Sequence, residues 1–390
     1  MNTGETLWKL PLNQLLEIKM SKKEISLINY SLFDKKYKNI LVTGGLGFIG
    51  SALIFRLLKE TNIKIINIDK SRQKNDSLSI NNQFSKFGKS RYCFLNHDLK
   101  NEEFFSKIFD DFDPDIVFHL AAESHVDRSI QSPRNFLDSN VVGTFNLLEN
   151  TQKHFFNLPK YRRSNFKFLH ISTDEVFGSL GSSGLFNENS NYNPRSPYSA
   201  TKAASDHLVD SWFHTFKLPT LISNCSNNYG PRQFPDKLIP NIIMNAINNK
   251  PIPIYGDGSN VRDWLFVEDH INALLLMACE GKPGSRYCIG GSEEKSNINI
   301  CKKICDLLDD LKPQRFSYSS LIEFVEDRPG HDFRYGIDSS LISKELGWDP
   351  LYKFDETLRE TIIWYLENQD WVNFIKKESG YKGERLGIQK

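Results

Sequence analysis

The sequence lacks a long apolar run, an excess of charge of either sign and a dense set of cysteines. Its longest apolar runs, such as 273–278, are too short to span a membrane, and its N-terminus has no charged-then-apolar signal pattern. Lys and Arg number 49 against 48 Asp and Glu, so the net charge of +1 favours neither nucleic acid nor an anionic membrane as a partner. We therefore expect a soluble protein that holds any anionic ligand with local groups.

The six cysteines are scattered through 390 residues and form no framework of close pairs. This usage is typical of a reducing compartment, so a cytoplasmic location is expected. Cys301 and Cys305 are four residues apart beside Ile300, Ile304 and Leu308, which predicts one buried face of a helix. Because no His or further Cys lies nearby to complete a ligand set, we expect no metal site.

Apolar strand patterns alternate with helical patterns from residue 39 to about residue 225. Strands are predicted at 39–43, 64–68, 91–95, 115–120, 167–171 and 220–225, with helices at 48–58, 102–109, 133–150 and 199–216. Apolar strands separated by helices form a parallel sheet that is covered on both faces. The sequence therefore predicts an α/β protein with a doubly wound, Rossmann-like parallel sheet.

The chain is long enough for one large domain or two of ordinary size. Residues 1–37 are predicted to form an N-terminal arm, packed on the body or on a partner, and residues 38–230 a dinucleotide-binding domain. Residues 231–390, richer in Pro and Gly at their start, are predicted to be mainly a smaller α/β lobe for the substrate, with 262–280 returning to the first domain. Further strands and helices are predicted at 236–248, 251–255, 286–289, 299–311 and 355–368.

A glycine-rich turn lies directly between the first strand and the first helix. It reads Thr43-Gly-Gly-Leu-Gly-Phe-Ile-Gly50, and its predicted ligand contacts are Gly44, Gly47, Phe48, Ile49 and Gly50. Glycines here allow the backbone to approach a pyrophosphate, while the helix N-terminus offers free N–H groups to the anion. The alternative is a tight strand–helix connection without a ligand.

Asp69 ends the second strand about 20 residues after the last glycine, where a carboxylate can bind ribose hydroxyls. Such a carboxylate would repel a 2'-phosphate, so it favours NAD over NADP, although Arg72 is an opposing signal. Asp98 and Leu99 follow the third strand and are predicted to contact the adenine end of the cofactor. For Asp98 the alternative is a strand-end cap.

Tyr198 and Lys202 are four residues apart at the start of a predicted helix, so both point to one face. An ammonium near a phenol lowers the pKa of the Tyr, which can then take a proton from a sugar hydroxyl while hydride leaves the same carbon. Thr173, Asp174 and Glu175 follow the fifth predicted strand. On their own, the Tyr–Lys pair could be an exposed helical pair, and the two carboxylates could face water.

Longer motifs make the chain similar to a known superfamily. They are His119-Leu-Ala-Ala-Glu-Ser-His-Val-Asp-Arg-Ser129, the stretches 172–178 and 198–202, Asn224-Cys-Ser-Asn-Asn-Tyr-Gly-Pro231, Phe234-Pro-Asp-Lys-Leu-Ile-Pro240, Arg262-Asp-Trp264 and Asp327-Arg-Pro-Gly-His-Asp332. Over about residues 39–368 the chain resembles the extended short-chain dehydrogenase/reductase superfamily. Within it, the chain most resembles the dTDP-glucose 4,6-dehydratase family.

The resemblance implies a reaction in which C4 of the sugar is oxidised with NAD, water is eliminated across C5 and C6, and hydride returns to C6. It implies that Thr173, Tyr198 and Lys202 serve the oxidation, that Glu175 is the base at C5, and that Asp174 is the acid at the C6 hydroxyl. The two adjacent carboxyls would need unequal environments to hold different protonation states. Epimerases of the superfamily need no such acid and base, so this pair separates the two activities.

The nucleotide sugar of such a reaction carries a diphosphate, and Arg262 is the best candidate to bind it because its planar fork matches phosphate oxygens. The resemblance implies that the other substrate-binding residues are Ser124, Asn227, Lys237, Leu238, Arg328 and His331. Departures from the family pattern include Phe177 in place of Tyr, the run 71–75 after the second strand, and Glu293 in place of a phosphate-contacting Asn. A carboxylate at 293 would repel a diphosphate.

The sequence thus predicts an NAD-dependent hydro-lyase that acts on dTDP-glucose. The resemblance also implies a homodimer formed through the helix that carries Tyr198 and the helix at 133–150. The alternatives are a 4,6-dehydratase for another nucleotide sugar, or a nucleotide-sugar epimerase or decarboxylase. A non-catalytic NAD-binding scaffold is an alternative of another class, and the intact Thr173, Tyr198 and Lys202 argue against it.

Overall fold

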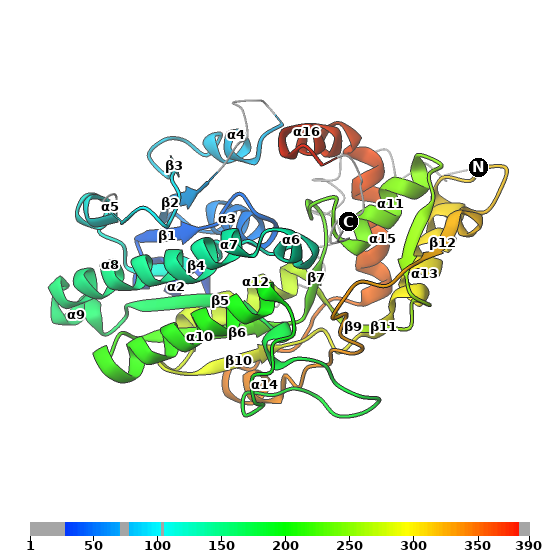
Figure 1. The fold of residues 1–390 in the computed structure, drawn as a ribbon. Coiled ribbons are helices and arrows are strands. Elements are labelled where there is room, and N and C mark those ends of the chain that lie inside the picture. Colours follow the sequence, from blue (N-terminus) through cyan, green and yellow to red (C-terminus); the bar gives the residue numbers. More distant parts are fainter. Residues whose placement is uncertain (1–27, 71–77, 103–104, 382–390) are drawn as a thin grey trace.

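The computed structural model describes residues 28–70, 78–102 and 105–381. In these residues seven strands form one parallel sheet in the order β10-β6-β5-β4-β1-β2-β3 (Figure 1). The strands are β1 (Asn39–Thr43), β2 (Lys64–Asp69), β3 (Tyr92–Asn96), β4 (Ile116–His119), β5 (Lys167–Thr173), β6 (Thr220–Cys225) and β10 (Arg286–Ile289). The strand order reverses at β1, which pairs with β2 on one side and β4 on the other. This confirms the predicted doubly wound fold.

Helices cover both faces of the large sheet. One face carries α5 (Phe105–Phe112), α8 (Gly143–Asn157) and α10 (Pro197–Phe216), and the other carries α3 (Phe48–Glu60) and α12 (Val267–Glu280) (Figure 1). Successive strand residues alternate between the two cores, so Leu41 packs with the first set of helices while Ile40 and Val42 pack with the second. Strands that are apolar throughout are buried on both sides for this reason.

The helix predicted at 133–150 is interrupted. It consists of α7 (Pro133–Phe136), a π-helical turn η3 (Leu137–Val142) and then α8. The wide turn directs Asn140 toward two other segments: its Oδ1 accepts from Glu123 N at 2.8 Å and its Nδ2 donates to Thr201 Oγ1 at 3.0 Å. Such turns are frequent at functional sites, and hydrophobic periodicity does not reveal them.

The end of the predicted N-terminal arm packs on the body of this chain. It forms α2 (Tyr30–Lys36), with Phe33 and Tyr37 fully buried. At the end of α12, Tyr37 OH donates to Ala278 O at 2.6 Å and Lys36 Nζ donates to Cys279 O at 2.5 Å. The remainder of the arm, residues 1–27, lies outside the described residues.

Beyond β6, a second group of elements lies beside the large sheet (Figure 1). Its strands are β7 (Asn227–Tyr229), β9 (Val261–Phe266) and β11 (Glu294–Ser296) in one small sheet, and β8 (Ile252–Tyr255) and β12 (Ile322–Val325) in another. Its helices are α11 (Leu238–Ile247), α13 (Asn297–Leu311), α15 (Phe354–Glu367) and α16 (Gln369–Ser379). Short elements elsewhere are α4 (Ile80–Ser85), α6 (Val126–Gln131), α9 (Lys160–Arg163), α14 (Ser340–Leu346) and the 3-10 turn η5 (Tyr318–Leu321).

The strand predicted at 286–289 was expected among the irregular elements of the smaller lobe, and this placement is wrong. As β10, it pairs in parallel with β6 at the edge of the large sheet. Its four residues show nothing locally that separates an edge strand of one sheet from a strand of another. The domain limits at 37 and 230 remain a prediction.

The buried helix face predicted around Cys301 and Cys305 is confirmed. Both thiols lie on α13 and are fully buried, together with Ile300, Ile304 and Leu308. Among the helices that the structure describes, none has the length and apolar character needed to cross a membrane.

Candidate active site

The site lies at the carboxyl edge of the large sheet, where β5 ends in Thr173. The chain then enters the 3-10 turn η4 (Asp174–Phe177), and Thr173 caps this turn by accepting a hydrogen bond from Glu175 N at 3.3 Å. This local geometry places two carboxyl groups directly after a buried strand. Phe177 ends the turn inside an apolar cluster and is only 3% exposed.

The first two turns of α10 supply Tyr198 and Lys202. The helix begins with a capping box, in which the side chains of Ser196 and Ser199 each bond the other's backbone N–H. Tyr198 is 8% exposed, and its phenol interacts with the side chains of Thr173 and Glu175. The end of β5 and the start of α10 therefore bring the predicted catalytic residues together.

Asp174 is held in an environment that favours its neutral form. It is 1% exposed, and its Oδ2 has no hydrogen-bond partner among the described residues. Burial, and then the charges of Glu175 and Asp263, raise its pKa well above the usual range, against the opposing effects of Arg262 and Thr173. These surroundings favour the neutral acid over the carboxylate.

Glu175 is only partly buried, and cations surround it. Burial raises its pKa, but Arg328, Arg262 and Lys237 each oppose that rise, in decreasing order. The neighbouring carboxyl is instead pushed further toward its neutral form by two other carboxylates. The two adjacent carboxyls therefore lie in unequal surroundings, and their roles as acid and base stay a prediction.

The expectation that Lys202 lowers the pKa of Tyr198 is wrong for the groups of this chain. Burial raises the pKa of the phenol well above its usual value, and Glu175 adds to this effect. The described hydrogen bonds of Lys202 run to Ile171 O at 2.8 Å and His170 Nε2 at 3.2 Å rather than to the phenol. Burial dominates because both side chains are almost completely removed from water.

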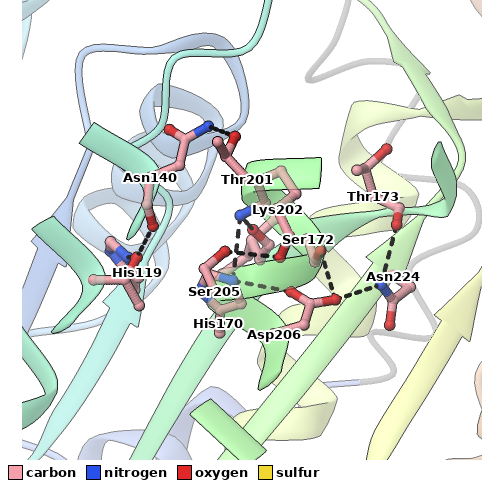
Figure 2. A network of polar contacts seen from close by, with 12 residues as sticks. His119, Asn140, His170, Ser172, Thr173, Thr201, Lys202, Ser205, Asp206 and Asn224 are labelled. Atoms are coloured by element: carbon pink, nitrogen blue, oxygen red, sulfur yellow. Dashed lines mark hydrogen bonds and ion pairs between the residues drawn. The ribbon is translucent and has the colours of Figure 1, made fainter. Parts of the chain in front are cut away.

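Sequence reasoning missed a buried polar network below these residues, which Figure 2 shows. Asp206 and His170 are both fully buried, and Asp206 Oδ2 accepts hydrogen bonds from Ser172 Oγ at 2.9 Å and Asn224 Nδ2 at 3.1 Å. A signal existed in the spacing, because Asp206 follows Lys202 by four residues as Lys202 follows Tyr198. All three therefore lie on one face of α10.

The glycine-rich turn has the shape that a pyrophosphate requires. A Cβ on Gly44, whose φ is +74°, would lie 2.5 Å from Ala121 N, and one on Gly50 would lie 2.3 Å from Gly44 O. Helix α3 begins immediately after Gly47, and no side chain caps its N-terminus. The first N–H groups of α3 are therefore open to a ligand, and the positions of Gly44 and Gly50 are closed to any side chain larger than hydrogen.

Asp69 stands beside this turn at the end of β2. Its Oδ2 accepts a hydrogen bond from Leu46 N at 2.9 Å, which fixes the carboxyl against the turn. Burial raises its pKa to about 6, against backbone hydrogen bonds that lower it. Arg72 and the altered run 71–75 fall outside the described residues, so their part in cofactor binding remains untested.

Asp98 and Leu99 follow β3, and they lie in different surroundings. Asp98 Oδ1 accepts from Lys100 N at 3.2 Å, which is compatible with the strand-end cap weighed from the sequence. Leu99 is 6% exposed and belongs to the core beneath α5 and α8. Contact of either residue with adenine stays a prediction.

The predicted substrate residues come from five segments, and three of them, Lys237, Arg262 and Arg328, interact with Glu175. Lys237 Nζ donates to Ser124 O at 3.0 Å, and Leu238 begins the helix that follows. Arg328 forms an ion pair of 3.1 Å with Asp127, while His331 Nδ1 lies 2.6 Å from Asp327 Oδ1. Asn227 Oδ1 is buried without a partner among the described residues, which leaves an acceptor available to a ligand.

Arg262 is more constrained than a free phosphate ligand would be. It is 5% exposed and stacks on the Tyr335 ring with its guanidinium carbon 4.4 Å from the centroid. It donates to three backbone carbonyls, those of Val261 at 2.7 Å, Asp332 at 3.0 Å and Phe333 at 3.3 Å. These contacts fix its position near Asp174 and Glu175 but occupy part of its fork, so diphosphate binding by Arg262 remains a prediction.

Glu293 is less repulsive toward an anion than its type suggests. Its carboxylate forms an ion pair of 2.8 Å with Lys295, and its backbone N–H donates to Asp263 Oδ1 at 2.9 Å. The Lys295 ammonium offsets the charge of the carboxylate that replaces the family's Asn.

Comparison with known proteins gives a consistent result. A family model described as GDP-mannose 4,6 dehydratase matches residues 41–361. The dTDP-glucose 4,6-dehydratases of Salmonella typhimurium and Neisseria meningitidis are each 48% identical to the chain, over 89% and 90% of it and 99% and 100% of their own lengths. The crystal structure of DesIV, a dTDP-glucose 4,6-dehydratase from Streptomyces venezuelae with NAD bound, has a TM-score of 0.76 at 35% identity and covers 87% of this chain and 100% of its own. The chain belongs to the dTDP-glucose 4,6-dehydratase family of extended short-chain dehydrogenases/reductases.

Proposed function

We propose that this chain is an NAD-dependent hydro-lyase that converts dTDP-glucose into dTDP-4-dehydro-6-deoxy-glucose and water. The observation that carries the proposal is the adjacent pair of carboxyls with unequal surroundings. Two carboxylates and one guanidinium act on Asp174, whereas three cations and one carboxylate act on Glu175. An enzyme that only inverts C4 needs neither an acid nor a base at C5 and C6. Family membership supports the same activity.

The cofactor proposed for the site is NAD, which in the bound form takes up hydride from C4 of the sugar and gives it to C6. Gly44, Gly47 and Gly50 would hold the pyrophosphate together with the N–H groups of Phe48 and Ile49 at the start of α3. Asp69 would accept from the ribose hydroxyls, and its carboxylate supports NAD over NADP. The shape of the turn fits this assignment because a Cβ at Gly44 or Gly50 would collide with the backbone of the turn and of Ala121.

The oxidation at C4 needs a group to take the hydroxyl proton, and we assign it to Tyr198. Thr173 Oγ1 lies at the end of β5 beside the phenol and can donate a hydrogen bond to the C4 oxygen. Lys202 lies one turn further along α10, and its positive charge, together with that of the oxidised nicotinamide when bound, would have to offset the burial that raises the pKa of the phenol. The ketone formed at C4 makes the proton at C5 acidic.

The elimination then uses the carboxyl pair. Glu175 takes the proton from C5, and Asp174, protonated at rest, gives its proton to the departing C6 hydroxyl, which leaves as water. Glu175 afterwards returns a proton to C5. Tyr198 has then gained one proton and Asp174 has lost one, so a proton that leaves Tyr198 and one that returns to Asp174 through solvent restore the starting state, with one water released for each sugar.

The nucleotide diphosphate is assigned to Arg262 on β9 and to Arg328 and His331 in the loop after β12. The sugar is assigned to Ser124, Asn227, Lys237 and Leu238. Support comes from the interaction of Arg262, Arg328 and Lys237 with Glu175, because this places three cations at one end of the site. A chain with a net charge of +1 has to concentrate its cations in this way to hold a doubly charged diphosphate.

Assembly and location are proposed as a homodimer in the cytoplasm. The dimer would form through α8 and α10, which pack side by side and carry the aromatic pair Phe145 and Trp212, with ring centroids 5.7 Å apart. Leu137 is 42% exposed on the adjoining π turn, and Phe216 is 37% exposed at the end of α10. Sedimentation of the wild type and of Phe145→Asp should give a dimer and a monomer, and a monomeric wild type would refute the assembly.

The proposed location rests on the cysteines. All six are free, which supports a reducing compartment.

The test of the reaction is product mass. Incubation with dTDP-glucose should give a product lighter by one water with no net formation of NADH, whereas an epimerase leaves the mass unchanged and a decarboxylase releases carbon dioxide. Parallel incubations with UDP-, CDP- and GDP-sugars identify a dehydratase for another nucleotide. Tyr198→Phe should abolish turnover, and a biological role that survives this substitution would indicate a non-catalytic scaffold.

A further inference from the structure

The face of α10 that carries Tyr198 and Lys202 continues to a third ionisable side chain. Asp206 is fully buried one turn beyond Lys202, and the sequence resemblance gives it no role. Figure 2 shows its carboxylate at the centre of the polar network behind the site. A buried carboxylate is costly unless it is paired, so its retention here calls for a physical reason.

One oxygen of Asp206 is completely occupied by neutral donors. Its Oδ2 accepts from Ser172 Oγ at 2.9 Å, from Tyr192 OH at 2.7 Å and from Asn224 Nδ2 at 3.1 Å. The same Asn224 amide donates to Thr173 O at 3.0 Å, so the network reaches the end of β5 directly. These donors come from β5, from the loop before α10 and from β6, and they fix the carboxylate in one place.

The other oxygen of Asp206 connects to the catalytic ammonium. Its Oδ1 lies 3.2 Å from His170 Nε2, and the same nitrogen lies 3.2 Å from Lys202 Nζ. A single ring nitrogen cannot donate to the carboxylate and accept from the ammonium at once. When Lys202 is charged and donates to His170, Asp206 Oδ1 receives no hydrogen bond from the ring. The carboxylate and the ammonium are then separated by the His170 Nε2 atom.

We propose that Asp206 is a positioning residue whose buried carboxylate, bridged by His170 Nε2, is the countercharge that keeps Lys202 protonated behind Tyr198. This role rests on the proposed function, in which the Lys202 charge stabilises the phenolate. The Asp206 carboxylate acts through Lys202 and does not touch the sugar.

Among the groups that face Lys202 from the neighbouring elements, Asp206 supplies the negative charge, because burial raises the pKa of the Cys225 thiol to about 12 and keeps it neutral. The facing groups are His119 on β4, His170 on β5, Cys225 on β6, and Tyr198 and Asp206 on α10, while Arg286 on β10 acts on His170 and on Tyr192. Burial lowers the pKa of Lys202 to about 8, against Asp206 and Cys225. Burial acts to raise the pKa of Asp206, but His170, Lys202 and Tyr192 lower it to about 2, so the carboxylate stays ionised at working pH.

Loss of the carboxylate should let Lys202 lose its proton at a lower pH. The two 3.2 Å contacts through His170 Nε2 put the charges at most about 6 Å apart, and at an effective dielectric constant of about 20 the lost attraction corresponds to a fall of about two pH units. We assign the alkaline limb of the pH profile of kcat/KM for dTDP-glucose to Lys202. In Asp206→Asn this limb should therefore move to lower pH by about that amount. An unmoved limb in an active, folded Asp206→Asn enzyme would overturn the proposal.

Tyr192→Phe is the matched control. It removes one hydrogen bond from the same carboxylate and leaves the charge in place. A merely structural role of the network predicts similar profiles for both variants, whereas a countercharge predicts a shifted limb only in Asp206→Asn. If Asp206→Asn does not fold, Asp206→Ser, which also removes the charge, should shift the limb in the same direction, and an unmoved limb there would also refute the role.

A second readout needs no turnover. The free energy of unfolding is measured for the wild type, Asp206→Asn, Lys202→Met and the double variant, at pH 6 and at about pH 10. The two positions should be coupled favourably at pH 6, where Lys202 is charged, and the coupling should disappear at the higher pH. Equal coupling at both pH values would contradict a charge interaction. A wild type without dehydratase activity refutes the proposed function, whereas an active wild type with no such coupling refutes the role of Asp206.

Discussion

Replacement of Glu175 by Gln separates the two halves of the proposed reaction. Gln keeps the size of the side chain but cannot take the proton from C5. Thr173, Tyr198 and Lys202 are untouched, so oxidation at C4 should continue. The negative charge of Glu175 raises the pKa of Tyr198 and of Asp174, so its loss should make the phenolate easier to form.

The size of the effect follows from the role of the lost group. A positioned general base contributes a factor of about 10² to 10⁴, which corresponds to about 3–5.5 kcal/mol in the barrier of the elimination step. The remaining cations Arg262, Arg328 and Lys237 lose the carboxylate that they face and should bind the substrate's diphosphate at least as well. We therefore expect kcat to fall by that factor with little change in KM.

The assay follows the absorbance of reduced nicotinamide and the product mass in a single turnover. Glu175→Gln should accumulate enzyme-bound NADH and release no dehydrated sugar. Asp174→Asn is the matched control. Water loss should stop, but its intact Glu175 should still exchange the C5 proton with deuterated solvent. Glu175→Gln should neither exchange the C5 proton nor release water. Normal turnover by Glu175→Gln would refute the assignment of the base.

Three further predictions concern stability and cofactor binding. Gly44→Ala should destabilise the fold by about 2–5 kcal/mol in urea titrations and abolish NAD binding, because its Cβ meets Ala121 N at 2.5 Å with φ at +74°. The control Gly347→Ala, at φ +66° with nothing within 4 Å, should lose only about 1–2 kcal/mol of stability. Equal losses in the two variants would contradict the steric argument. Asp69 has its folded-state pKa raised to about 6, so between pH 4 and pH 6 the folded protein holds more protons than the unfolded chain and stability should fall as pH rises, by about 1–3 kcal/mol. Asp69→Asn should flatten this trend, and NAD affinity measured by calorimetry should rise through pH 6 only in the wild type. Tyr37→Phe should destabilise by about 1–3 kcal/mol because it leaves the carbonyl of Ala278 without its 2.6 Å donor, whereas Tyr161→Phe, 74% exposed, should be neutral in the same melt.

The large sheet could be predicted from the sequence because its strands are apolar on both faces and its helices are amphipathic. The strands at 39–43 and 220–225 were placed to the residue. The glycine turn and the Tyr–Lys pair were also located, since both are short motifs fixed by their place between a strand and a helix. Their roles remain predictions from resemblance and geometry.

Other features depend on contacts between distant segments. β10 returns to the large sheet after 60 residues of other structure, and its four residues carry no sign of their partner. The π turn at Leu137–Val142 depends on Asn140 reaching the segment at Glu123 and the helix at Thr201. The pKa of Tyr198 was predicted in the wrong direction because the sequence shows a nearby ammonium but not the burial that outweighs it.

The central claim is that one site oxidises C4, eliminates water and reduces C6. Incubation with dTDP-glucose deuterated at C4, followed by mass spectrometry and NMR of the product, tests all three steps at once. We predict a sugar lighter by one water that carries the deuterium at C6 and a proton from solvent at C5. A product of unchanged mass with deuterium still at C4, or a dehydrated product whose deuterium has been lost to solvent, would contradict the account.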